Sequence, residues 1–161
     1  MNQKQLNSFY PLTLVVRRLF HKLGHGVAAL HQNSDISVGM RAVLESVIDG
    51  GPQTVPHMAR IRPVTRQHIQ TLVNELLEGG YVEYIDNPAH KRSKLVAPTK
   101  RGMRAFDKMR AVESEAFSRA KIEVSPEELD AARKVLSALV ASFESKEWLV
   151  VVDQLSKKKE T

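Results

Sequence analysis

The middle of the chain constrains the fold most, because helix starts, helix stops and strand-like segments follow one another closely there. Thr54 is placed to cap a short helix that Pro63 ends, and Thr65 is placed to cap a longer second helix. Gly79-Gly80 stops the second helix, and the short segments "YVEYIDN" and "KLVAPT" then alternate as strands do. Short helix, tight turn, longer helix and hairpin predict a helix-turn-helix with a β-hairpin wing.

The second of these helices is predicted to bury an apolar face and to expose a row of short polar side chains. When Ile69 and Leu76 face inward, the polar residues of the helix face outward and Gln70 lies at the side. No acid occurs on the outer face before Glu75. Gln and Asn can pair bidentately with adenine, and Thr can contact a base edge or a thymine methyl. A polar outer face is also ordinary for a surface helix. The candidate DNA-contacting residues of this helix are Thr65, Arg66, Gln67, His68, Gln70, Thr71 and Asn74.

The tip of the predicted hairpin, "PAHKRSKLV" (residues 88–96), is rich in nitrogen and carries no acid. Hairpin tips are solvated and tolerate charge, so one interpretation gives this tip no partner. The other is contact with a polyanion, and the formal net charge of +6 favours a nucleic-acid or anionic-membrane partner. The candidate DNA-contacting residues of the wing are His90, Lys91, Arg92 and Lys94.

Two further helices are predicted before the middle segment. Pro11 is placed in the first turn of a helix that runs to about Leu30 and carries a long apolar stripe. Ser37 can cap an amphipathic helix that Gly50-Gly51 ends. Its apolar positions, which recur at helical spacing, are Met40, Val43, Leu44, Val47 and Ile48.

Two more helices are predicted after the hairpin. Thr99 starts a helix to about Ala120, whose inward residues are predicted to be Met103, Phe106 and Met109. A capping-box pair, Ser125 and Glu128, then starts a helix with an apolar seam at 3-4-3-4 spacing. The fold class predicted is therefore mainly α with a small antiparallel β-hairpin wing, an α+β winged helix-turn-helix lobe with terminal dimerisation helices.

The apolar stripes of the terminal helices indicate assembly. A helix of 20 residues is about 30 Å long, which a domain of this size cannot fully cover. The apolar run 148–152 also needs burial, in this chain or against another. The predicted division is a dimerisation helix over 1–35, a winged lobe over 36–99 and C-terminal helices over 100–161 that complete a homodimer interface, with a basic tail at 156–161. The alternative is that one chain folds its own two ends onto each other.

The middle of the chain resembles the multiple-antibiotic-resistance-regulator (MarR) family of winged-helix transcription regulators. "TVPHMARIRPVTRQHIQTLVNELL" is similar to that family's helix-turn-helix, and "GYVEYIDNPAHKRSKLVAPTKRG" is similar to its wing and the start of the next helix. The resemblance implies a homodimeric, ligand-responsive repressor that binds a pseudo-palindromic operator in double-stranded DNA. It further implies no cofactor, a small phenolic or aromatic effector between the lobes and the dimer helices, and Arg92 at the minor groove.

The chain departs from the family pattern in the wing and in the turn. The family's wing commonly carries two acids, and here Asn87 and His90 replace them, so Arg92 is expected to be held differently or less firmly. Pro98 replaces the usual leucine before Thr99, and Pro63 occupies a turn position that is often glycine.

The sequence gives weaker support to other functions. His21 and His25 stand four apart on one predicted helix, a spacing that allows two metal ligands, so a metal-responsive regulator of the same fold is an alternative. Another alternative is a winged helix that has lost DNA binding and serves only in protein–protein contact. The absence of cysteine, of a phosphate-binding glycine loop and of a nucleophile elbow argues against an enzyme. No stretch has the ~20 apolar residues of a membrane span, so a cytoplasmic protein is expected.

Overall fold

The computed structural model describes residues 1–62, 64–90 and 92–157. The predicted roles of Pro63, of Lys91 in the wing and of most of the basic tail therefore lie outside the described residues. The chain forms two compact units, Met1–Arg119 and Ala120–Thr161. The division into 1–35, 36–99 and 100–161 concerns function, and it stays a prediction.

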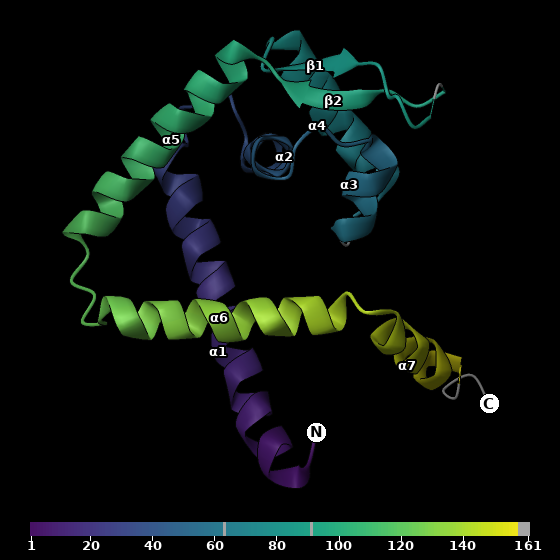
Figure 1. The fold of residues 1–161 in the computed structure, drawn as a ribbon. Coiled ribbons are helices and arrows are strands. Elements are labelled where there is room, and N and C mark those ends of the chain that lie inside the picture. Colours follow the sequence, from purple (N-terminus) through teal and green to yellow (C-terminus); the bar gives the residue numbers. More distant parts are fainter. Residues whose placement is uncertain (63, 91, 158–161) are drawn as a thin grey trace. The chain divides into compact units, whose positions relative to one another are not determined.

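The first unit is mainly helical and carries one antiparallel hairpin, which confirms the predicted fold class (Figure 1). Its elements in chain order are α1 (Gln3–Leu30), α2 (Val38–Asp49), α3 (Val55–Ile61), α4 (Arg66–Glu78), β1 (Val82–Ile85), β2 (Leu95–Pro98) and α5 (Lys100–Arg119). The hairpin pairs Val82 with Pro98 and Ile85 with Leu95. Gln53, just before α3, adds an isolated bridge to Val96, which ties the start of the helix-turn-helix to the wing.

The helices of the lobe begin and end where their caps predict. The side chains of Ser37, Thr54 and Thr65 each accept a hydrogen bond from the backbone N–H three residues later, which satisfies a donor that a helix start leaves free. Gly51 and Gly80 follow the ends of α2 and α4 with φ of 74° and 68°, a conformation that glycine adopts without strain.

One apolar core holds the lobe together. The buried faces of α2 and α4 agree with their predicted positions, and α5 adds Phe106 and Met109. The residues buried almost completely are Phe106, Leu44, Met58, Ile69, Leu76, Val43, Val47, Val73 and Val96. This core places α4 and the hairpin side by side, so the predicted recognition helix and wing belong to one packed body (Figure 1).

The start of α1 was wrongly predicted. The helix begins at Gln3 and not near Pro11, which lies inside it. Asn2 and Gln5 form a capping box: the Gln5 N–H donates to Asn2 Oδ1 at 2.9 Å, and the Asn2 N–H donates to Gln5 Oε1 at 2.8 Å. This cap starts the helix about two turns earlier. The helix tolerates the loss of the one backbone hydrogen bond that proline cannot donate.

Met103 was also wrongly predicted to face inward. It is 43% exposed, whereas the buried positions of α5 are Gly102, Phe106, Met109 and Glu113. A Cβ at position 102 would lie 2.0 Å from the carbonyl oxygen of Tyr81, so the helix packs through its glycine there. Because of that close approach, Gly102 faces inward at this point of α5, and the neighbouring Met103 faces outward.

The second unit consists of α6 (Pro126–Phe143) and α7 (Lys146–Lys157). The predicted capping box is confirmed: the Ser125 N–H donates to Glu128 Oε2 at 2.8 Å, and the Glu128 N–H donates to Ser125 Oγ at 3.2 Å. The rings of Phe143 and Trp148 pack with centroids 4.9 Å apart. No residue described in α6 or α7 is buried, and the same holds for α1. In the described part of the chain, no helix has the length and apolarity to cross a membrane.

Candidate nucleic-acid interface

The predicted outer face of α4 lies on the surface of the lobe. Gln70 is half-buried at the side of the helix, as expected. The other candidate residues of the helix are exposed, namely Thr65, Arg66, Gln67, His68, Thr71 and Asn74. The hydroxyl of Thr65 accepts from the His68 N–H at 3.1 Å, so its oxygen also caps the helix. The first turn of α4 holds no acid, and its N-terminus carries the partial positive charge of the helix dipole.

Besides Thr65, three of the candidate side chains on this face make hydrogen bonds. The Thr71 hydroxyl donates to the Gln67 carbonyl oxygen at 3.1 Å, which leaves its lone pairs and methyl group available. Gln70 Nε2 donates to Asn74 Oδ1 at 2.8 Å and to the Tyr84 hydroxyl at 2.9 Å. The face is therefore partly organised before any ligand binds.

The sequence did not identify Tyr84 as part of this surface. Tyr84 lies on β1, and its hydroxyl reaches the side of α4 across fourteen positions of sequence. The available signal was an aromatic residue in a strand that directly follows the recognition helix. Its partner on α4 could not be deduced without the packing of hairpin on helix.

The wing tip presents the predicted basic side chains. His90, Arg92 and Lys94 are exposed. Asn87 Nδ2 donates to Ser93 Oγ at 3.1 Å across the tip, and Asn87 Oδ1 accepts from the Ala89 N–H at 3.1 Å. Asn87 therefore holds the shape of the tip, while Arg92 makes no ion pair among the described residues. How Arg92 is held stays a prediction.

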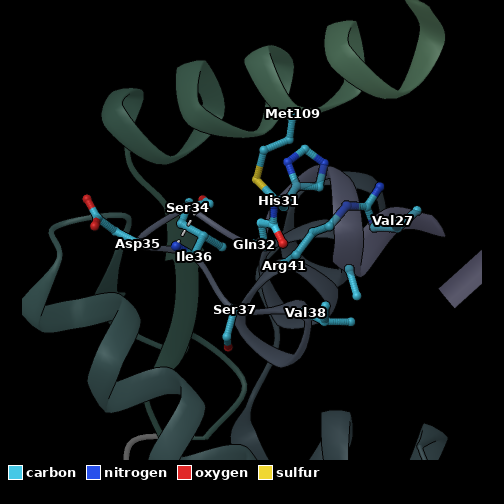
Figure 2. Close-up of a pocket in the computed structure, with 11 residues that line it drawn as sticks. Val27, His31, Gln32, Ser34, Asp35, Ile36, Ser37, Val38, Arg41 and Met109 are labelled. Carbon is cyan, nitrogen blue, oxygen red and sulfur yellow. Dashed lines mark hydrogen bonds between the residues drawn. The ribbon is translucent and has the colours of Figure 1, made fainter. Parts of the chain in front are cut away.

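A separate pocket of about 300 Å³ lies where the end of α1, the start of α2 and the middle of α5 meet. Its apolar lining includes Val27, Ile36 and Met109, and its polar lining includes His31 and Arg41. Figure 2 shows the Met109 side chain extending from α5 toward the His31 ring. One sequence does not mark such a pocket, because its lining comes from the end of α1, the connection that follows it, the start of α2 and the distant α5.

Beside the pocket, Glu113 of α5 joins all three helices. It is buried, and its carboxylate accepts from Arg41 Nε at 2.8 Å and from Arg41 Nη2 at 2.7 Å. His31 Nε2 lies 3.0 Å from the same carboxylate, and Arg41 also contacts Glu45 at 3.1 Å. The signal for this group was an acid on the apolar face of α5, four residues after Met109.

The two histidines that would serve a metal-responsive regulator are exposed on α1. Among the described residues, no group of three or more histidine, cysteine, aspartate or glutamate side chains could hold a metal ion. The pair His21 and His25 therefore gains no third ligand from the described part of the chain.

Comparisons with known proteins agree on one family. The model of the MarR family matches residues 41–93, the stretch that holds the helix-turn-helix and the wing. An uncharacterised protein of Mycobacterium tuberculosis is 30% identical over 127 residues, which cover 79% of this chain and 86% of the relative. A solved MarR family transcription regulator is 27% identical with a TM-score of 0.67, over 87% of this chain and 93% of that one. The chain belongs to the MarR family.

The fold of the family extends over most of the molecule. A MarR family transcriptional regulator from Silicibacter pomeroyi matches with a TM-score of 0.74 at 19% identity, over 89% of this chain and 95% of that one. In this MarR family protein, α3 and α4 are the helix-turn-helix, and β1 with β2 is the wing. The fold is that of DNA-binding transcription regulators.

Proposed function

We propose that this protein is a homodimeric repressor that binds a pseudo-palindromic operator and leaves it when a small aromatic or phenolic ligand binds. The observation that carries the proposal is the acid-free, exposed face of α4 beside a basic wing in one packed lobe. A regulator of this kind needs neither a cofactor nor catalytic residues.

The first two turns of α4 are suited to the major groove. Among the described residues, Gln67 and His68 use only backbone atoms in their hydrogen bonds to Thr71 and Thr65, so their side chains are free to meet base edges. Arg92 of the wing is suited to a narrow, A·T-rich minor groove, where negative potential attracts arginine. Lys94, and Lys91 outside the described residues, would meet phosphate as point charges.

The terminal helices support a dimer. Single chains of soluble proteins rarely leave large apolar side chains in contiguous exposed rows. Here Phe20 on α1 is 73% exposed, and Leu149 and Leu155 on α7 are 59% and 60% exposed. A second copy would cover these rows and would set two α4 helices on one face of the duplex, with half-site centres about 10 base pairs apart.

The pocket beside Glu113 supports an effector site. Its volume of about 300 Å³ is at the lower end of the range for small-ligand pockets. A related fold is that of BpsR from Bordetella bronchiseptica, whose DNA binding is regulated by 6-hydroxynicotinic acid, at 16% identity and a TM-score of 0.62. A flat aromatic ligand here would contact Arg41 and His31, which link α1 to the lobe through Glu113.

Binding of the purified protein to the DNA beside its own gene tests the proposal. A dimer that neutralises roughly 8 phosphates gives a log–log slope of affinity against salt of about −7. Affinity that stays flat between low and moderate salt would contradict DNA binding. Phenolic ligands are then added at fixed salt, and release of the DNA is expected for those that fit the pocket.

A matched pair of variants separates specific charge contacts from net charge. Arg92→Ala is expected to weaken operator binding strongly. Arg133→Ala removes the same charge from α6, where Arg133 pairs with Asp130 on the surface, and it is expected to have little effect. Equal losses in both variants would show that only the total charge matters.

A further inference from the structure

We propose that Tyr84 is a positioning residue for DNA recognition, which fixes the amide of Gln70 so that α4 presents a defined order of hydrogen-bond donors and acceptors. The inference rests on the proposed binding of DNA by α4. It concerns how the base-reading side chains are held.

The geometry leaves the Gln70 amide little freedom. Both of its N–H bonds are used, one toward the Tyr84 hydroxyl at 2.9 Å and one toward Asn74 Oδ1 at 2.8 Å. If the Gln70 amide alone turned over, its Oε1 would face Asn74 Oδ1 and two acceptors would meet, so the two amides can turn only together. The Tyr84 hydroxyl can still donate its own hydrogen while it accepts from Gln70.

The anchor of this arrangement is rigid. Tyr84 pairs in the hairpin with Val96, which is fully buried. Val96 is held in turn by two backbone hydrogen bonds to Gln53, at 3.2 Å and 2.8 Å, on the other side of the strand. The backbone of Tyr84 is therefore held against the core, and its side chain, which is 37% exposed, reaches α4 from there.

The consequence is a fixed hydrogen-bonding pattern on the side of α4. Gln70 retains only its acceptor Oε1, so it cannot form the bidentate pair with adenine that needs both a donor and an acceptor. It can accept from the exocyclic amine of cytosine or adenine. Asn74 retains its Nδ2 donors and one lone pair of Oδ1, since that oxygen accepts a single hydrogen bond from Gln70. From the sequence alone, both Gln70 and Asn74 are predicted to be able to pair bidentately with adenine. The contact with Tyr84 removes this possibility for Gln70.

The test uses the full-length protein with Tyr84→Phe, an operator duplex, its set of single-base substitutions and a random duplex of equal length. Tyr84→Phe is expected to lose about 3- to 10-fold in operator affinity, in line with one hydrogen bond, and little on random DNA. At the bases that Gln70 and Asn74 face, discrimination among substitutions should flatten. Elsewhere in the operator it should be unchanged.

Two further variants make the test specific. Tyr81→Phe removes a phenol hydroxyl at the residue before β1, where the ring packs under Arg101, and it should change neither affinity nor discrimination. In a Gln70→Ala background, Tyr84→Phe should have no further effect, because the amide it positions is gone.

The outcomes separate the inference from the function on which it rests. If the parent discriminates among operator variants and Tyr84→Phe does so equally well, Tyr84 is not a positioning residue. Equal losses on operator and random DNA would make it a backbone contact and would also overturn the inference. A parent without salt-dependent DNA binding would overturn the proposed function, and this inference with it.

Discussion

The winged lobe and the terminal helices have similar apolar periodicity but opposite burial. In the lobe, α2 and α4 each bury four residues against neighbours of the same chain. In α1, α6 and α7 no described residue is buried, although each helix carries apolar residues at helical spacing. Periodicity thus shows which face of a helix avoids water, and it does not show what covers that face.

The difference implies two kinds of stability. The lobe is stabilised by burial within its own chain, which does not depend on protein concentration. The terminal helices would be stabilised by a second copy, so their stability should rise with concentration. Variants in the two regions should therefore differ in size of effect and in concentration dependence.

The largest expected effect is in the core of the lobe. Phe106 is 1% exposed, and Phe106→Ala should lower the free energy of unfolding by about 3–5 kcal/mol, because it leaves a cavity among packed side chains. Phe117→Ala is the matched control on the same helix, since Phe117 is 46% exposed. Urea denaturation at fixed protein concentration measures both. A control that costs as much as Phe106→Ala would contradict the division between buried and exposed faces.

The next effect concerns the junction of the two regions. Glu113→Ala removes the acceptor of Arg41 and His31 and should cost about 3 kcal/mol, because Glu45 is then the only ion-pair partner of a nearly buried cation among the described residues. Glu115→Ala is the control, because its ion pair with Arg119 is on the surface and should cost less than about 1 kcal/mol. Hydrogen exchange should show α1 loosening in the first variant alone. An unchanged α1 would mean that Glu113 does not join it to the lobe.

Local signals were sufficient for most of the fold. The caps Ser37, Thr54, Thr65 and Ser125 act within three residues, so the sequence around each one predicts its helix start. The start of α1 was missed although its capping box is equally local. Proline at a first turn is a strong signal, but in α1 the capping box of Asn2 and Gln5 sets the start and Pro11 lies inside the helix.

The candidate site was predictable only in part. Which residues of α4 point outward follows from helical spacing and the apolar face. The contacts that those residues make cannot be predicted from helical spacing, because the contact of Gln70 with Tyr84 depends on the hairpin packing against α4. Glu113 shows the same limit, since its partners come from two other helices. Met103 shows that a glycine can decide which face of a helix approaches its neighbour.

A smaller effect is expected in α7, and only on assembly. Leu149 is 59% exposed in the single chain, and Leu149→Ala should raise the dimer dissociation constant about 10- to 30-fold, the scale of a buried interface anchor. Gln154→Ala on the same helix is the control. Sedimentation over a range of concentrations measures both. A parent that is monomeric at micromolar concentration would contradict the dimer itself.

The smallest effect is at the start of α6, where polar hydrogen bonds replace burial. Hydrogen bonds from its own backbone N–H and from the Ser125 side chain lower the pKa of Glu127 below its ordinary value of 4.5. Because the folded pKa is lowered, this contribution to stability is present above pH 4.5 and is lost as pH falls through the lowered value.

The titration of Glu127 by carboxyl NMR tests this local arrangement directly. Ser125→Ala should move the titration midpoint of Glu127 upward, because it removes one hydrogen bond and loosens the helix start that supplies the other. Ser142→Ala, near the opposite end of α6, is the control and should leave the midpoint where it is. An unmoved midpoint in Ser125→Ala would show that the Ser125 side chain does not hold the Glu127 carboxylate.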